Sequence, residues 1–152
     1  MAKVYTLTRE QWLPNPIDLV FDFFSRPENL QSITPPWLDF RIVESPRELT
    51  VGSLIHYSLR WRLIPLRWTT RITAWDPPNS FVDAQVSGPY TLWEHEHRFV
   101  EEAGGTRIYD TVHYSLPLAF LGTLAHRGWI RSDLEGIFDF RRQKMEQLLG
   151  RN

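Results

Sequence analysis

The sequence contains no cysteine, which excludes disulfide bonds, thiol catalysis and cysteine metal ligands. It also has almost no net charge, because 17 basic and 18 acidic side chains give −1 at pH 7. Such a balance argues against a nucleic-acid partner, which would need a basic surface. No apolar run approaches the length of a membrane span, and the first residues lack the apolar core of a signal peptide. We therefore expect a cytoplasmic protein.

Aromatic side chains, in contrast, are abundant: 7 Trp, 9 Phe and 5 Tyr in a chain of 152 residues. The length predicts a single domain, residues 1–152, that can bury one substantial core. A closely packed core and a pocket for an apolar or ring-shaped ligand would both use these rings. Composition alone does not choose between the two.

Hydrophobic periodicity and turn signals predict the order of the elements. After a first strand that ends at Leu13, a helix is expected over residues 16–24, with Asn15 as its cap and Pro16 at its first position. A second short helix is expected to start through Ser25 and Pro27. Strands should then follow over residues 38–44, 53–62, 66–75, 80–86, 90–101 and 106–116. The short Gly- and Pro-containing turns between them predict an antiparallel meander.

The last segment, residues 118–149, has a helical pattern. Ser132 and Glu135 have the spacing of a capping box, and Gly128 lies just before them. We therefore expect a break between residues 128 and 131, with a shorter helical piece before it. The apolar stripe of the long piece is expected at Leu134, Ile137, Phe138, Met145 and Leu148.

Residues 90–99 carry the most informative pattern. At a period of two, one face holds Trp93, His95, His97 and Phe99, and the other holds Glu94, Glu96 and Arg98. The charged face belongs in water. The mixed face suits a closed core poorly, because every buried polar group needs a partner. A cavity that contains water or a ligand accommodates it more easily, so we expect a hollow domain.

The order of elements resembles the helix-grip fold of START domains, the birch pollen allergen and the polyketide cyclase/dehydrase proteins, and most of all the small bacterial polyketide cyclases and coenzyme-Q-binding START-type proteins. The stretches that carry the resemblance are residues 14–24 (from Pro-Asn-Pro), 34–37 (Thr-Pro-Pro-Trp), 75–78 (Trp-Asp-Pro-Pro), 88–90 (Gly-Pro-Tyr) and 93–95 (Trp-Glu-His). It implies an α+β fold: a curved antiparallel seven-stranded sheet wrapped around a long C-terminal helix, with two short helices after the first strand. It does not imply one activity.

Alternation assigns inward faces on the other strands as well. Tyr57 and Trp61 should point inward on residues 53–62, and Asp110 and Tyr114 on residues 106–116. On residues 80–86 two phases remain open, one with Asp83 and Gln85 inward and one with the aliphatic side chains inward.

Two kinds of chemistry could arise on this wall. A carboxylate beside an imidazole sets its tautomer and raises its basicity, so His95, His97 and Asp110 are candidate proton-transfer residues. The alternative is that these groups only satisfy one another. His95-x-His97 also places two metal ligands on one face, but a convincing third ligand is missing, so no metal or other cofactor is expected.

We expect the chain to bind a small hydrophobic or aromatic ligand, such as a lipid, a quinone or a polyketide-like molecule, in a cavity between the sheet and the C-terminal helix. The expected ligand-binding residues are Tyr57, Trp61, Asp83, Gln85, Trp93, His95, His97, Phe99, Tyr114, Leu134, Ile137 and Phe138. The first alternative is an aromatase/cyclase- or dehydratase-type enzyme, which the resemblance permits. The second is a lipid or quinone carrier.

A hairpin around residues 60–68 has an apolar tip flanked by Arg60, Arg62 and Arg67. Three interpretations stay open: a lip over the cavity, a contact in a homodimer, or a transient membrane contact. The membrane contact would be made by Leu63, Ile64 and Leu66. Residues 118–121 could close the same entrance, and the pattern allows a monomer or a homodimer.

Overall fold

A computed structural model describes residues 3–117 and 124–150, with the side chains of residues 124–128 left aside. In chain order the elements are β1 (Tyr5–Leu13), α1 (Ile17–Phe24), α2 (Pro27–Ser32), η1 (Pro36–Leu38), β2 (Arg41–Glu44), β3 (Leu54–Trp61), β4 (Ile64–Asp76), β5 (Ser80–Ser87), β6 (Leu92–Glu102), β7 (Gly105–Ser115) and α4 (Leu124–Leu149). No helix of the described residues is long and apolar enough to cross a membrane.

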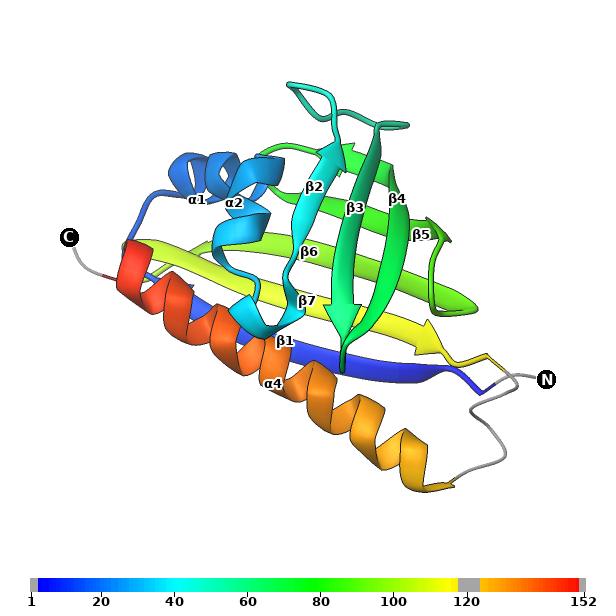
Figure 1. The fold of residues 1–152 in the computed structure, drawn as a ribbon. Helices are drawn as coiled ribbons and strands as arrows, with labels where there is room; N and C mark the ends of the chain where they lie inside the picture. The colour runs from blue at the N-terminus through cyan, green and yellow to red at the C-terminus, as the bar shows by residue number, and fades with distance from the viewer. Residues whose placement is uncertain (1–2, 118–123, 151–152) are drawn as a thin grey trace.

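The seven strands form one antiparallel sheet in the order β1-β7-β6-β5-β4-β3-β2. Figure 1 shows how strongly this sheet curves, since β2, β3 and β4 stand across the direction of β1, β6 and β7. The helix α4 packs along the sheet, and α1 and α2 lie near the C-terminal end of α4. The predicted helix-grip α+β fold is confirmed.

The register of the sheet places acidic and imidazole side chains on one inner face. On β5 and β6, Asp83 lies opposite His95, and on β6 and β7, His97 lies opposite Asp110. The phase of β5 that the sequence left open is now resolved, because Phe81 is buried and Val86 is exposed. Asp83 therefore points inward, beside the two imidazoles.

The core consists of two clusters on either side of this polar strip. Under α1, the ring of Phe21 packs edge-on against Phe81 and Phe99, with ring centroids 5.8 and 5.4 Å away. The second cluster joins the end of β7 to α4 through residues such as Val112 and Phe138. These clusters hold the sheet and α4 in place around the space between them.

Helix starts differ from the expected ones in two places. Pro16, not Asn15, occupies the cap position of α1, and no side chain caps the helix. The carbonyl oxygen of Asn15 instead accepts a 2.8 Å hydrogen bond from the hydroxyl of Thr106, which ties this turn to β7. Ser25 ends α1 by donating to the carbonyl oxygen of Asp22, and α2 starts after Arg26.

The expected break in the C-terminal helix is wrong, because α4 is continuous from Leu124 to Leu149. Ser132 and Glu135 lie inside the helix, where Glu135 pairs with Arg131. A glycine in a helix costs about 1 kcal/mol, which the packing of Leu134 and Phe138 against the sheet can offset. The expected stripe ends early, since Leu148 is exposed. The expected lid at residues 118–121 falls outside the described residues.

Candidate functional site

A cavity of about 240 Å³ lies between the concave face of the sheet, the short helices and α4. Strands β3 to β6 supply one wall, and Ile130, Leu134, Ile137 and Phe138 of α4 supply the other. Its lining is mostly apolar, with polar groups confined to a few places. This arrangement is typical of a site that binds a small ligand.

One end of the cavity is built from aromatic rings. Trp68 of β4 stacks on Tyr57 with centroids 5.7 Å apart and meets Trp93 edge-on at 5.2 Å. Tyr90 lies 4.9 Å from Trp93 and is held by Gln85. The Gln85 side chain donates to the carbonyl oxygen of Tyr90 at 2.7 Å and accepts from its backbone N–H at 3.1 Å. Gln85 thus positions this end of the cavity.

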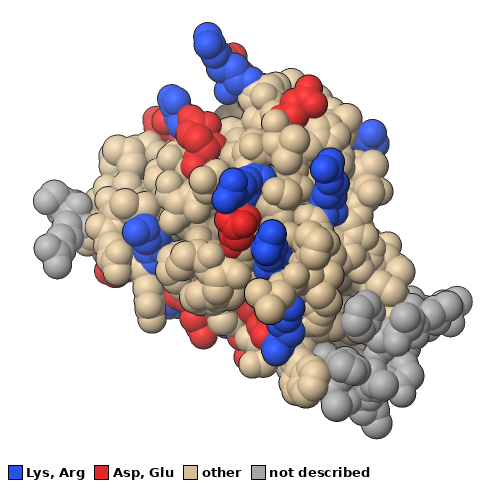
Figure 2. Space-filling model, viewed as in Figure 1, with Lys and Arg blue, Asp and Glu red and all other residues tan. Residues whose placement is uncertain are grey.

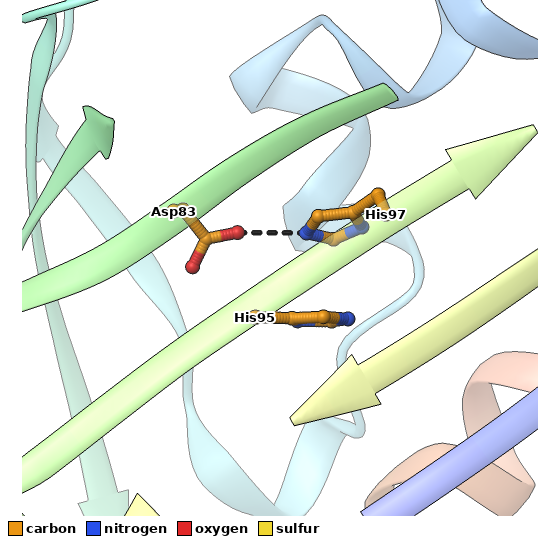
Figure 3. Close-up of side chains that lie close together, drawn as sticks. All are labelled: Asp83, His95 and His97. Carbon is orange, nitrogen blue, oxygen red and sulfur yellow. Dashed lines mark hydrogen bonds and ion pairs between the residues drawn. The ribbon is translucent and has the colours of Figure 1, made fainter. Parts of the chain in front are cut away.

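Further along the wall, two imidazoles and two carboxylates form two hydrogen-bonded pairs across three strands. Figure 3 shows the bond between His97 and Asp83. Nε2 of His97 lies 2.7 Å from Oδ2 of Asp83, and Nε2 of His95 lies 2.8 Å from Oδ1 of Asp110. Each imidazole therefore bonds the carboxylate diagonal to it and not the one directly opposite. Nδ1 of His97 is 3.6 Å from Oδ1 of Asp110, which brings the two pairs close together.

The two imidazoles differ in what a ligand can reach. His97 is stacked between Phe81, at 4.1 Å, and His95, at 3.7 Å between ring centroids, and its Nδ1 is buried. His95 also lines the cavity, and no described residue forms a hydrogen bond with its Nδ1. Since Nε2 of His95 is engaged by Asp110, Nδ1 is the atom left for a ligand.

Burial and charge set the protonation of this wall. Burial, together with the neighbouring His95, lowers the pKa of His97 to about 4, although Asp83 and Asp110 oppose both effects. Burial alone would raise the pKa of Asp110, but the hydrogen bond and charge of His95, helped by Arg141 and His97, lower it below its ordinary value. The same balance, with His97 as the main partner, lowers the pKa of Asp83. At neutral pH both carboxylates are ionised and His97 is neutral.

A metal ion fits this wall poorly. Asp83, His95 and His97 do bring donor atoms within 4.8 Å of one another. However, the two rings are stacked 3.7 Å apart with an interplanar angle of only 24°. Their lone pairs lie in the ring planes and run side by side, so they do not converge on one ion as a tetrahedral site requires. The geometry favours a hydrogen-bonded network.

Most of the expected ligand-binding residues do lie on the cavity wall. They are Tyr57, Trp61, Asp83, Trp93, His95, His97, Leu134, Ile137 and Phe138. Three expected ligand-binding residues lie elsewhere, and so does Asp110, the proton-transfer candidate. Gln85 bonds the backbone of Tyr90, and Asp110 bonds His95. Phe99 packs against α1, and Tyr114 stacks on Tyr5 with ring centroids 5.4 Å apart. Alternation placed Phe99, Asp110 and Tyr114 on the inner face and left the phase of Gln85 open. The depth of each side chain along the curved sheet decides whether it reaches the cavity.

The sequence interpretation missed several residues of the wall, and three of them matter most for the site. Trp68 lies on the inner face of β4, and the alternation of Leu66, Trp68 and Ile72 was the available signal. Arg141 of α4 lies over the rings of Phe24 and Phe138, at 5.4 and 5.7 Å. Asp133, which had no sequence signal, accepts a 2.7 Å hydrogen bond from the indole of Trp61 at the rim.

Comparisons with known proteins agree with this architecture. The family model described as polyketide cyclase/dehydrase and lipid transport matches residues 13–135. No curated protein matches the chain. Among solved structures, protein Ms6760 from Mycobacterium smegmatis is 20% identical, with 94% of this chain and 89% of that one covered and a TM-score of 0.69.

Two further structures extend the likeness across kingdoms. Protein CV1439 from Chromobacterium violaceum is 12% identical, covers 97% of this chain and 98% of its own, and has a TM-score of 0.71. The ginseng major latex-like protein 151 from Panax ginseng is also 12% identical, with 95% and 96% covered and a TM-score of 0.69. At such identities the likeness shows the fold alone.

Proposed function

The chain belongs to the polyketide cyclase/dehydrase and lipid transport family, and we propose that it binds one small apolar or ring-shaped molecule. Membership of this family implies hydrophobic-ligand binding in general. A lipid, a quinone and a polyketide-like molecule all have this chemistry. The observation that carries the proposal is the cavity of about 240 Å³, with an aromatic end and an ionisable wall. The cytoplasmic location expected from the sequence stays a prediction.

The aromatic end and the ionisable wall of the cavity would contribute differently to ligand binding. Each ring or large apolar group that is buried against Trp68, Trp93 and Phe138 contributes about 1.5–3 kcal/mol. A hydrogen bond to Nδ1 of His95 adds about 1 kcal/mol and sets the orientation. Apolar burial therefore supplies most of the affinity, and the imidazole supplies selectivity for a ligand with a polar group at one end.

A titration with the apolar fluorophore N-phenylnaphthylamine tests the proposal. The probe is added to the full chain, and energy transfer from tryptophan reports its arrival beside Trp61, Trp68 and Trp93. The informative variant is Ile137→Trp, because Ile137 lines the cavity from α4 and a larger ring would occupy the space. Leu148→Trp is the matched control, since Leu148 lies on the same helix but is exposed.

The second candidate function is an enzyme that moves a proton within the bound ligand, and the Asp110–His95 pair favours it. When Nε2–H of His95 donates to Asp110, Nδ1 carries the lone pair and can accept a proton from a ligand in the cavity. This would suit an aromatase/cyclase- or dehydratase-type reaction.

The variant His95→Gln separates the two functions. In an enzyme it would lower the turnover of a poly-β-ketone mimic about 100-fold or more, while the affinity for N-phenylnaphthylamine would change about twofold at most. A wild-type chain that binds the mimic without converting it would exclude the enzyme and leave the binding protein.

A further inference from the structure

The turn between β3 and β4 has an unusual backbone. Trp61 pairs with Ile64, so Arg62 and Leu63 form a two-residue turn, with φ values of 49° and 71°. Turns of this kind usually contain Asn-Gly, because other residues rarely adopt a positive φ. Two ordinary L-residues in succession are therefore strained here, and strain of this kind often accompanies a functional role.

The strained turn presents apolar side chains to solvent. Leu63 is 86% exposed and Ile64 is 50% exposed. Trp129, at the start of α4, is 51% exposed and lies beside them, because the guanidinium of Arg62 is 5.5 Å from its ring. We call Leu63, Ile64 and Trp129 the hairpin tip. Leu66, which the sequence placed in the same contact, is half-buried and lines the cavity instead.

The tip is held firmly against α4. Arg62 donates to Asp133 through Nη2 at 3.1 Å and through Nε at 3.3 Å, and its guanidinium also lies 5.6 Å from the ring of Trp61. Trp61 donates to the same carboxylate. Because Trp61 and Asp133 line the cavity, the tip stands at the cavity rim.

A small excess of positive charge lies near the tip. Figure 2 shows Lys and Arg side chains gathered where the lower ends of β3 and β4 meet α4, with acidic side chains among them. Arg60 lies near Asp39, Arg62 pairs with Asp133, and Arg131 pairs with Glu135. Arg67 is exposed and has no ion pair with any described residue. The arginines therefore outnumber their acidic partners.

We propose that the hairpin tip docks on an anionic lipid surface. Leu63 and Ile64 would enter the interface, and the arginines would face the lipid headgroups. A second copy of this chain fits less well, because a twofold contact would bring the same arginines face to face. The contact would place the cavity rim beside the bilayer. The role of this contact in ligand exchange rests on the proposed ligand binding, whereas the docking itself can be tested without it.

Vesicle flotation tests the docking. The full chain is mixed with vesicles of phosphatidylcholine alone, or of phosphatidylcholine and phosphatidylglycerol at about two to one. We expect flotation with the anionic vesicles only, and about a fivefold weaker partition for Arg67→Gln. Leu63→Glu should abolish flotation, whereas Leu148→Glu, the same change at an exposed site at the other end of α4, should not alter it.

Leu63→Gly distinguishes lost docking from lost folding. Glycine accepts the positive φ of this position, so the thermal midpoint should rise by about 2–4 °C while flotation falls. Equal flotation of Leu63→Glu and Leu148→Glu would overturn the proposal. The proposal would also be overturned if the wild-type chain were a dimer that Leu63→Glu dissociates, or if the wild-type chain floated with neither kind of vesicle. Binding of N-phenylnaphthylamine by the same samples shows separately whether the cavity functions.

Discussion

Burial keeps His97 neutral beside two ionised carboxylates, and this makes its titration important for stability in mildly acidic solution. Its two flat neighbours, Phe81 and His95, stack on the ring at 4.1 and 3.7 Å between centroids. Among the described residues, Asp83 is the hydrogen-bond partner of the ring, and Asp110 lies 3.6 Å from its Nδ1. A proton on this ring would be buried together with its charge, which the fold opposes.

We predict that the free energy of unfolding falls as the pH is lowered from 6.5 to about 4. The unfolded chain binds a proton at His97 near pH 6.5, whereas the folded chain does so only near pH 4. The stabilisation is therefore complete above the pKa of the unfolded chain and is lost as the pH falls toward the folded pKa. The free energy of unfolding decreases by about 3 kcal/mol at most. Chemical denaturation at a series of pH values measures it.

His97→Gln should flatten this pH dependence, because the titrating ring is gone. His113→Gln is the control, since His113 lies on the outer face and bonds the hydroxyl of Thr6. Asp83 and Asp110 have lowered pKa values, so their effect appears only at lower pH, below the ordinary carboxyl range. An equal slope in His97→Gln and the wild-type chain would contradict the assignment.

Single residues also show where the sequence was informative. A period of two was enough to place His95 and His97 on the inner face. It could not predict that each ring bonds the diagonal carboxylate, because that choice depends on side-chain rotamers and on the twist between strands. Nor could it place Asp133, whose contact with Trp61 joins positions that are 72 residues apart.

Among the elements, α4 differs most from its sequence-based expectation. Gly128 and the capping-box spacing of Ser132 and Glu135 indicated a break, yet the helix runs through all three. Local signals of this kind are worth about 1 kcal/mol each, whereas a buried Phe138 contributes several times more. The strands were predicted more accurately, because alternation and glycine- or proline-rich turns specify them independently.

Gly136 provides a test of α4 as an unbroken helix. It lies in the middle of α4, and a Cβ at this position would have no atom within 4 Å. We predict that Gly136→Ala stabilises the protein by about 0.5–1 kcal/mol, since alanine loses less conformational freedom in a helix. Gly105→Ala should destabilise it, because a Cβ there would collide with the carbonyl oxygen of Leu13. Thermal unfolding of both variants measures the difference, and a destabilised Gly136→Ala would argue against a continuous helix.

Taken as a whole, the molecule is a curved sheet that, together with its two core clusters, encloses a cavity. The helix α4 covers the sheet, and the two packed clusters lie on either side of the polar strip. The mixed face of β6 predicted this hollow, because imidazoles and large rings together need polar partners and room. The size and the ends of the cavity depend on how far the sheet curves, which no local pattern specifies.

The titration with N-phenylnaphthylamine tests this account most directly, because it measures whether the space between the sheet and α4 admits an apolar molecule. We predict saturable binding to the wild-type chain, about tenfold weaker binding to Ile137→Trp, and unchanged binding to Leu148→Trp. Equal affinity of Ile137→Trp and the wild-type chain, or no saturable binding at all, would contradict the account.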